Sequence, residues 1–316
     1  MPEHELFPTP ANVHWGHFDG ALPSVVTVET GDTITIHALS GGPAQLPPPS
    51  MGMTVSREHI EVHEQVAGGP GPHIMTGPVA VEGAVPGDAL RVEILDIQLR
   101  CDWGYNIVRP GSGALPNDTK EERVIHLPID RTKGTVHTAW GIDIPAEPFF
   151  GVMGTAPPRE LGQQSSVVPG AFGGNMDNKM LAAGSVLYLP VFEPGGLFSV
   201  GDGHAVQGDG EVCTTAVETG LTGTFRIDLI KEAGRALPRA ENSTHHITMG
   251  FDEDLDKAAE IALREMIRWI VAGGALTFED AYRLCSLVAD MRVTQLVNRA
   301  KGVHLILPKW TGMIGH

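Results

Sequence analysis

The chain has 316 residues, and its mixture of 42% hydrophobic and 19% charged residues excludes an intrinsically disordered polymer. The formal net charge of −16 argues against nucleic acid or an anionic membrane as a partner, because both bind basic surfaces. The 39 glycines and 24 prolines follow no repeating period, so they indicate many turns and a β-rich fold with few long helices.

Targeting signals and disulfide bonds are also unsupported. The N-terminal MPEHELFPTP has no basic region followed by an apolar segment, and the sequence contains no run of about 18 apolar residues. Cys101, Cys213 and Cys285 lie far apart and form no CxxC pair, which argues against a disulfide framework and a cysteine-based zinc ribbon. We therefore expect a reduced, soluble, cytoplasmic protein without a membrane span.

The N-terminal half has the pattern of strands separated by long loops. Residues 24–39 alternate apolar and polar side chains around a Gly-Asp turn, which predicts a half-buried hairpin, and the pattern returns at residues 78–97. Residues 41–73 are rich in glycine and proline and are expected to form a loop. A loop of that length inside a domain is usually functional or a lid. Residues 103–119 and 153–175 have a similar composition.

Strands resume after residue 180, and helices follow near the C-terminus. Alternation predicts strands at residues 184–193, 211–218 and 222–231. An apolar stripe at helical spacing then runs from Leu255 to Ile270, with acidic residues in its first turn and two glycines after its end.

A second helix is predicted to begin at the segment TFED. There Thr277 can cap the first turn, and Asp280, three residues later, can complete a near capping box. A final strand, VHLILP, closes the chain. The sequence thus predicts a single α+β domain over residues 1–316. We expect that domain to be β-rich, a sandwich of mostly antiparallel strands with a C-terminal helical pair packed on the sheets.

The first candidate site is the run GDGHAVQGDGE, residues 201–211. Asp202 and His204 lie two residues apart, so an extended backbone would point both side chains the same way, and glycine turns could fold Glu211 back toward them. Carboxylate and imidazole ligands in this mixture suit zinc, manganese or iron better than calcium alone. Two Gly-Asp-Gly turns with a merely hydrogen-bonded histidine explain the same residues equally well, so both interpretations stay open here.

The second candidate is the run GAFGGNMDNK, residues 170–179. Its glycines permit close approach of the backbone to a ligand, and Asp177 between Asn175 and Asn178 offers oxygen ligands and amide donors. A polar loop between strands is an equally good explanation of this run alone. However, the two runs flank one predicted strand, residues 184–193. A chain that turned back there would bring both to the same rim, which favours a site.

Other residues carry weaker signals. Trp15 and Trp103, in HWGHFDG and CDWGYN, could line a pocket, and His73 in a Gly- and Pro-rich loop could reach a site. Aromatic residues in β folds are more often core, and a lone loop histidine is more often structural or exposed. No GxGxxG, Walker A or GxSxG motif is present, so the sequence supports neither nucleotide binding nor a serine nucleophile elbow.

Taken together, these motifs resemble the acetamidase/formamidase family. The resemblance rests on PGAFGGNMDNK and GDGHAVQGDGEV, on TGPVAVEGAVPGDAL, HWG and CDWGYN, and on AYRLCSLVADMRVTQLV with KGVHLILPK near the C-terminus. It covers nearly the whole chain. The resemblance implies a metal-dependent hydrolase of short aliphatic amides, such as formamide or acetamide, with a β-rich α+β fold and a homo-oligomeric assembly.

Carried over to this sequence, the resemblance implies a centre built from four residues. We expect Asp177, Asp202 and His204 to bind a divalent metal, zinc first, with calcium or manganese as alternatives, and Glu211 to act as the base. Further roles follow for Asp209 as the rival base, Asn175 at the oxyanion, and His73 and Trp103 at the substrate. The alternatives are hydrolysis of another linear or cyclic amide or a carbamoyl compound, or a non-catalytic protein that metal stabilises.

Overall fold

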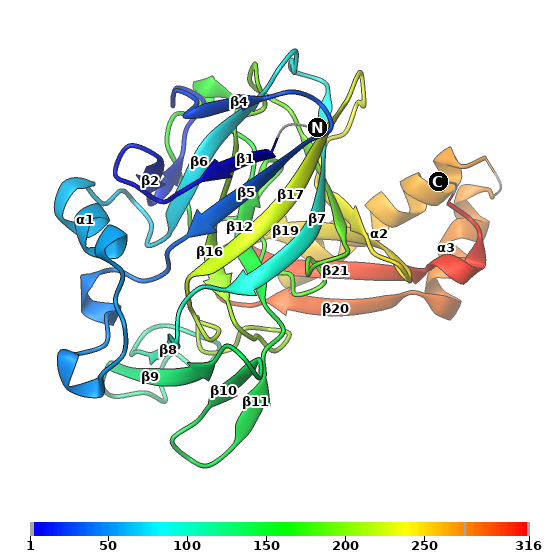
Figure 1. The fold of residues 1–316 in the computed structure, drawn as a ribbon. Coiled ribbons are helices and arrows are strands. Elements are labelled where there is room, and N and C mark those ends of the chain that lie inside the picture. Colours follow the sequence, from blue (N-terminus) through cyan, green and yellow to red (C-terminus); the bar gives the residue numbers. More distant parts are fainter. Residues whose placement is uncertain (1–2, 275, 315–316) are drawn as a thin grey trace.

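The computed structural model describes residues 3–274 and 276–314. Two sheets packed face to face form the body of the molecule, and a helical pair projects from one end of the larger sheet (Figure 1). In the described chain that sheet has nine strands, in the order β1 (Glu3–Leu6), β5 (Asp32–Ala38), β17 (Leu221–Ile230), β7 (Ala89–Leu99), β15 (Val186–Pro190), β18 (Arg239–Glu241), β19 (His245–Asp252), β21 (Lys301–Pro308) and β20 (Asp290–Gln295).

The second sheet carries the residues that matter for the site. Its strands are β14 (Gly173–Asn175), β12 (Phe149–Gly154), β16 (Phe198–His204), β6 (Ile74–Val81) and β2 (Val13–Trp15), with β4 (Val26–Val28) pairing in parallel to β6. A four-stranded sheet and a two-stranded ribbon complete the β-structure: β8 (Trp103–Val108), β9 (Arg123–Asp130), β10 (Thr135–His137) and β11 (Asp143–Pro145), then β3 (His17–Phe18) with β13 (Gln164–Ser165).

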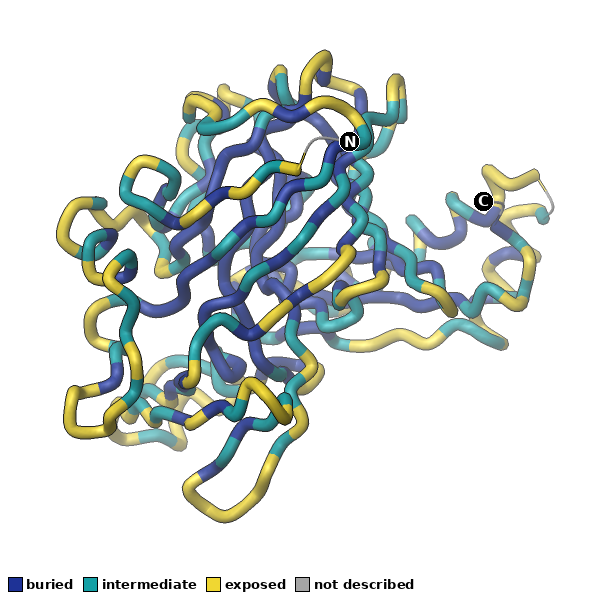
Figure 2. The backbone as a smooth tube through the Cα atoms, in the orientation of Figure 1, coloured by how far each residue is buried: buried dark blue, intermediate teal, exposed yellow. Residues whose placement is uncertain are grey.

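The hydrophobic core lies between the two large sheets. Ile34 and Ile36 of β5 are fully buried on one side, and Phe198 and Val200 of β16 are fully buried on the other. In Figure 2 the buried backbone lies mainly in the strands between the two sheets, and most exposed segments lie in loops, although part of β7 on the outer face of the larger sheet is also exposed. Each side chain of this size contributes roughly 1.5–3 kcal/mol when it is removed from water, so this layer holds the second sheet in place.

The helices form where the sequence provides caps. In α2 (Leu255–Ala272) the carboxylate of Asp254 accepts hydrogen bonds from two backbone N–H groups of the first turn, and in α3 (Phe278–Val288) the Thr277 hydroxyl does the same for one. The buried side of α2 packs on β19 and β21. The shorter helices are α1 (Arg57–Gln65) and the 3₁₀ turns η1 (Pro43–Gln45), η2 (Pro49–Met51), η3 (Arg159–Leu161) and η4 (Lys309–Thr311).

The predicted fold class is confirmed: the protein is a β-rich α+β fold of mostly antiparallel strands with a C-terminal helical pair. The predicted hairpin at residues 24–39 is wrong in its pairing, because β4 pairs with β6 whereas β5 pairs with β1 and β17. The Gly-Asp turn therefore carries the chain from one sheet to the other. The similar pattern at residues 78–97 does the same, since β6 and β7 also lie in different sheets.

One strand prediction and one loop prediction also need correction. Residues 211–218 are not a strand but a chain of turns with isolated bridges, which leaves their acidic side chains free to turn inward. Residues 41–73 are not a plain loop, since they contain η1, η2 and α1. Along the described residues no helix is long and apolar enough to cross a membrane.

Candidate active site

Five buried ionisable side chains converge at the end of β16. They are Asp177, Asp202, His204, Glu211 and Glu218. Nε2 of His204 lies 3.3 Å from Oδ2 of Asp202 and 3.3 Å from Oε2 of Glu218. Neither contact has the geometry of a hydrogen bond, because both ring nitrogens of His204 are without a hydrogen-bond partner. The imidazole is therefore surrounded by acidic oxygens without being tied to one of them.

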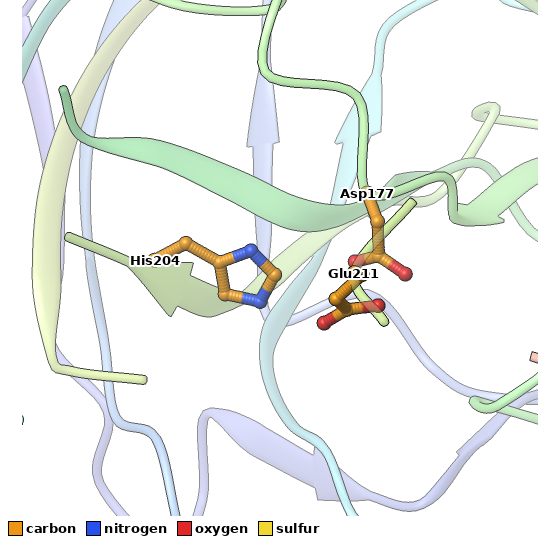
Figure 3. Close-up of side chains that lie close together, drawn as sticks. All are labelled: Asp177, His204 and Glu211. Carbon is orange, nitrogen blue, oxygen red and sulfur yellow. The ribbon is translucent and has the colours of Figure 1, made fainter. Parts of the chain in front are cut away.

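Asp177 and Glu211 approach His204 from two different loops, one after β14 and one after β16, and their side chains point toward one another in Figure 3. Potential ligand atoms of Asp177, His204 and Glu211 all lie within 4.8 Å of one another. The same is true of Asp202, His204 and Glu218. The cluster thus offers two overlapping groups of metal ligands that share one imidazole.

Gly151 of β12 forms the floor of this cluster. The antiparallel register of β12 and β16 places it across from Asp202. A Cβ atom on Gly151 would lie 2.5 Å from Oδ1 of Asp177, 2.6 Å from Oδ2 of Asp202 and 2.8 Å from Cε1 of His204. The three side chains can therefore meet only because residue 151 has no side chain.

Several of the buried polar atoms here have no hydrogen-bond partner in the protein. They are Oδ1 of Asp177, both ring nitrogens of His204 and Oε2 of Glu211. The other oxygen of Asp177 accepts a hydrogen bond from Nδ2 of Asn298, which fixes the orientation of the carboxylate. Each unpartnered buried group costs about 1–3 kcal/mol, and more when it is charged. These atoms belong to the group formed by Asp177, His204 and Glu211, so the chemistry of that group fits a bound cation.

The backbone at the site is strained. In the described chain, seven non-glycine residues have a positive φ, and four of them carry or adjoin the acid cluster. They are Asp177 (φ 48°), Asp202 (φ 55°), Glu211 (φ 43°) and Thr214 (φ 85°). Such conformations cost of order 1–3 kcal/mol each and persist where the surrounding structure enforces them, most often at functional sites. The left-handed backbone also turns carboxylates inward that extended strands would direct elsewhere.

Three of the acids have raised pKa values. Burial, together with the charge of Asp202, raises the pKa of Asp177 to about 8. Burial and the charge of Asp177 raise the pKa of Glu211 well above its usual range, and burial raises the pKa of Glu218 to about 7. The protein itself therefore does not supply enough positive charge to keep these acids ionised. A bound cation would supply it.

Asp202 and His204 behave in the opposite way. Burial alone would raise the pKa of Asp202, but the imidazoles of His73 and His204 outweigh it and hold that pKa below its usual range. Burial would likewise lower the pKa of His204, but Glu218 and Asp202 raise it well above the usual value. Nε2 of His73 lies 3.7 Å from Oδ2 of Asp202. Asp202 thus remains a carboxylate between two histidines.

A pocket of about 580 Å³ opens onto the cluster. Asp202, Glu211 and Glu218 line it, whereas Asp177 and His204 are not part of its wall. The rest of the wall comes from segments far apart in sequence: Trp15, which the sequence suggested could line a pocket, residues 39–42 and Gln45, residues 68–74, Tyr105, Ile107 and Arg109, Val167 and Asn175, residues 214–215, and Val297 with Asn298. A concave site with convergent polar groups is the usual form of an active site.

Most of the residues singled out from the sequence meet here. Asp177, Asp202, His204 and Glu211 form the cluster, and Asn175 and His73 lie on the pocket wall. The two motifs do not meet through a hairpin of the strand between them. Instead β15 belongs to the larger sheet, and the chain returns from it so that β14 and β16 both pair with β12.

Two of the expected residues lie elsewhere. Asp209 forms ion pairs with Lys179 and Arg292 at 3.3 and 3.7 Å, outside the cluster. Trp103 is only 1% exposed and is not part of the pocket wall; its indole N–H donates to the carbonyl of Thr54. The apolar body of Trp103 is packed in the protein, as is usual for an aromatic residue in a β fold.

Sequence reasoning missed three important positions. Glu218 lies in EVCTTAVE, a run that reads as a strand, and Asn298 and Gly151 belong to no motif. They reach the cluster only through long-range packing: Glu218 contacts His204, and Asn298 donates to Asp177. The glycine in FFGVMG was the one available signal, because glycine inside an apolar strand suggests close approach of another group.

Comparison with known proteins identifies the family of this chain. The model of the Acetamidase/Formamidase family matches residues 10–166 and 162–309. The chain belongs to the Acetamidase/Formamidase family. As a family member it resembles the crystal structure of an acetamidase from Bacillus halodurans, with 31% sequence identity and a TM-score of 0.85 over 99% of this chain and 100% of that chain.

Curated relatives of this family member match over a shorter stretch. An acetamidase of Mycolicibacterium smegmatis is 31% identical over 218 residues, which are 50% of this chain and 54% of that protein. A formamidase of Methylophilus methylotrophus is 29% identical over 212 residues, which are 51% of this chain and 52% of that protein. The matched part thus spans about half the length of these curated relatives.

The space above Gly151, in which Asp177, Asp202 and His204 meet, gives a direct prediction. In Gly151→Ala the added methyl group must displace the carboxylates of Asp177 and Asp202, so we expect the affinity for Zn²⁺ to fall at least about tenfold. The fold should survive, because the backbone of Gly151 is not left-handed. Isothermal titration calorimetry measures the affinity, and circular dichroism melting checks the fold.

Gly208→Ala is the matched control, because a Cβ atom at that glycine meets nothing within 4 Å. It should bind Zn²⁺ as the unmodified protein does. Unchanged Zn²⁺ affinity in Gly151→Ala would contradict the claim that the site depends on the missing side chain at residue 151.

Proposed function

We propose that this protein hydrolyses short aliphatic amides to a carboxylate and ammonia with the help of a divalent metal. The observation that carries the proposal is the set of unpartnered buried ligand atoms of Asp177, His204 and Glu211 beside an open pocket. Family membership supports amide hydrolysis as the reaction class. The named activities of the relatives, acetamidase and formamidase, support a small acyl group.

The proposed ligands are Asp177, His204 and Glu211. This set differs from the one expected from the sequence, in which Asp202 was a ligand and Glu211 the base, because a fully buried oxygen of Glu211 has no hydrogen-bond partner, whereas Asp202 contacts the two imidazoles of His73 and His204. Two carboxylates and one imidazole suit zinc, and they also accept manganese. When bound there, a divalent metal supplies Lewis acidity toward a water molecule and an amide carbonyl.

Glu218 is the proposed base. It lines the pocket, its Oε1 accepts a hydrogen bond of 2.9 Å from the backbone N–H of Ala216, and its Oε2 accepts one of 3.4 Å from the Ser40 hydroxyl. The carboxylate is thus held in position with Oε2 on the pocket side. In the reaction Glu218 takes a proton from the attacking water and delivers it to the leaving nitrogen as the C–N bond breaks. Such proton transfer typically contributes 10²–10⁴-fold to the rate.

Asn175 and His73 are proposed to position the substrate. Nδ2 of Asn175 uses one proton for the carbonyl of Val167 at 3.3 Å, which leaves its second N–H for the developing oxyanion. A donor in that role is often worth about 3 kcal/mol. Nδ1 of His73 lies 3.0 Å from the Ser166 hydroxyl, and this contact orients the ring on the pocket wall. A homo-oligomeric state and a cytoplasmic location remain predictions from the sequence.

Metal removal tests the proposal as a whole. Chelation followed by desalting should abolish ammonia release from formamide and acetamide, and added Zn²⁺ or Mn²⁺ should restore it. The reason is that the acid cluster alone lacks the positive charge needed to activate water or polarise the amide carbonyl. A coupled ammonia assay follows the reaction, and circular dichroism of the chelated protein separates loss of chemistry from loss of fold. Full activity in demonstrably metal-free protein would contradict metal dependence. Absence of ammonia release from the metal-loaded protein with any short amide would contradict amidase activity.

Matched amide substitutions separate the ligand from the base. Glu211→Gln should lose at least about tenfold in Zn²⁺ affinity, since it removes a ligand charge. Glu218→Gln should keep its zinc but lose about a hundredfold or more in kcat, since it removes the proton acceptor. Elemental analysis and the ammonia assay measure the two effects.

The control for this pair is Asp209→Asn, an equally conservative change at an acid outside the cluster. It should leave both quantities within about twofold of the unmodified protein. If Glu211→Gln keeps its metal and loses its rate while Glu218→Gln stays active, the two roles are exchanged.

A further inference from the structure

The pocket is much larger than a one- or two-carbon amide requires. Its volume of about 580 Å³ lies within the range of roughly 300–1,000 Å³ that is typical of sites for drug-sized ligands. Acetamide has four heavy atoms, and at about 30 Å³ per water-sized unit it needs only on the order of 100 Å³. The pocket therefore has room beyond the acid cluster for a larger group than the acyl chain of acetamide.

One side of the pocket wall is formed by three residues at or just beyond a single strand. Tyr105, Ile107 and Arg109 follow at intervals of two residues along and just beyond β8, so their side chains share a face, and all three line the pocket. The inner end is fixed at the cluster, because the backbone N–H of Tyr105 donates to the carbonyl of Glu218 at 2.9 Å. At about 3.3 Å per residue, the Cα atom of Arg109 lies roughly 13 Å from that of Tyr105, and the long Arg109 side chain can reach back over about half of that distance.

Chemical character changes along this face. The phenol of Tyr105 adjoins the acids, Ile107 presents an apolar surface, and Arg109 ends the row with a positive charge. The Arg109 side chain is 42% exposed, its Nε has no hydrogen-bond partner in the protein, and its ion pair with Glu122 is long, at 3.9 Å. The N–H groups of this guanidinium are therefore available to an anionic group that enters the pocket.

We propose that the preferred substrate is an amide whose acyl chain carries a distal carboxylate, the monoamide of a small dicarboxylic acid. This inference rests on the proposed amidase function and names its substrate class. The amide group lies at the acid cluster, a few methylene groups contact Ile107, and the carboxylate pairs with Arg109. Arginine suits this role because its planar N–H groups can bind a carboxylate with two parallel hydrogen bonds.

Kinetics with matched amides test the proposal. Glutaric acid monoamide and pentanamide have the same chain length and differ in the terminal carboxylate. The ratio of their kcat/KM values should favour the acid by at least about tenfold, and Arg109→Gln should lower that ratio by at least about tenfold, as expected for loss of one charge-assisted pair. Arg109→Lys should retain part of the preference.

Arg123→Gln is the control, because Arg123 is an arginine of the neighbouring strand β9 with a 77% exposed side chain, and it does not line the pocket. It should leave the ratio unchanged. A ratio near one in the unmodified protein, or an unchanged ratio in Arg109→Gln, would overturn the proposal while leaving amidase activity intact.

A binding measurement separates this proposal from the proposed function. If neither amide releases ammonia, the amidase function fails, and calorimetric titration with glutarate then decides the carboxylate site alone. Saturable glutarate binding that weakens at least about tenfold in Arg109→Gln but not in Arg123→Gln supports the site. Equal binding by all three proteins overturns it.

Discussion

Four carboxylates buried around one imidazole impose the constraint on which the rest of this structure depends. Two unit charges 4 Å apart interact by about 4 kcal/mol at an effective dielectric constant of 20, so the acids of the cluster repel one another strongly. His204 offsets only part of this repulsion, and His73 adds a contact to Asp202 alone. The repulsion that the histidines do not offset, together with burial, raises the pKa values of Asp177 and Glu211. A divalent cation bound there would relieve the same repulsion and satisfy the unpartnered atoms.

The sandwich supplies the rigidity that holds these groups together. Left-handed backbone at Asp177, Asp202 and Glu211 is unfavourable, and each of these residues adjoins a strand or turn anchored in the second sheet. The pairing of β12 with both β14 and β16 fixes the distance between the two motifs, and Gly151 leaves the space in which they meet. Fold stability and site geometry thus depend on the same three strands.

Much of this arrangement follows from the sequence, and the limits have a physical origin. The caps at Asp254 and Thr277 and the alternation in β5 are local signals, so α2, α3 and the strand were predictable. Two motifs held four of the five acid-cluster residues because short glycine turns gather them locally. The pairing of strands and the position of Glu218 beside His204 are set by contacts between distant segments. A local sequence pattern carries no information about such contacts.

The central claim is that one divalent ion binds between Asp177, His204 and Glu211. Anomalous diffraction from crystals of the zinc-loaded protein, recorded on both sides of the zinc edge, locates the ion directly. The account predicts a single strong peak about 2.0–2.2 Å from one oxygen of each acid and from one ring nitrogen. A peak bound instead by Asp202 and Glu218, or no peak in this cluster at full zinc loading, would contradict it.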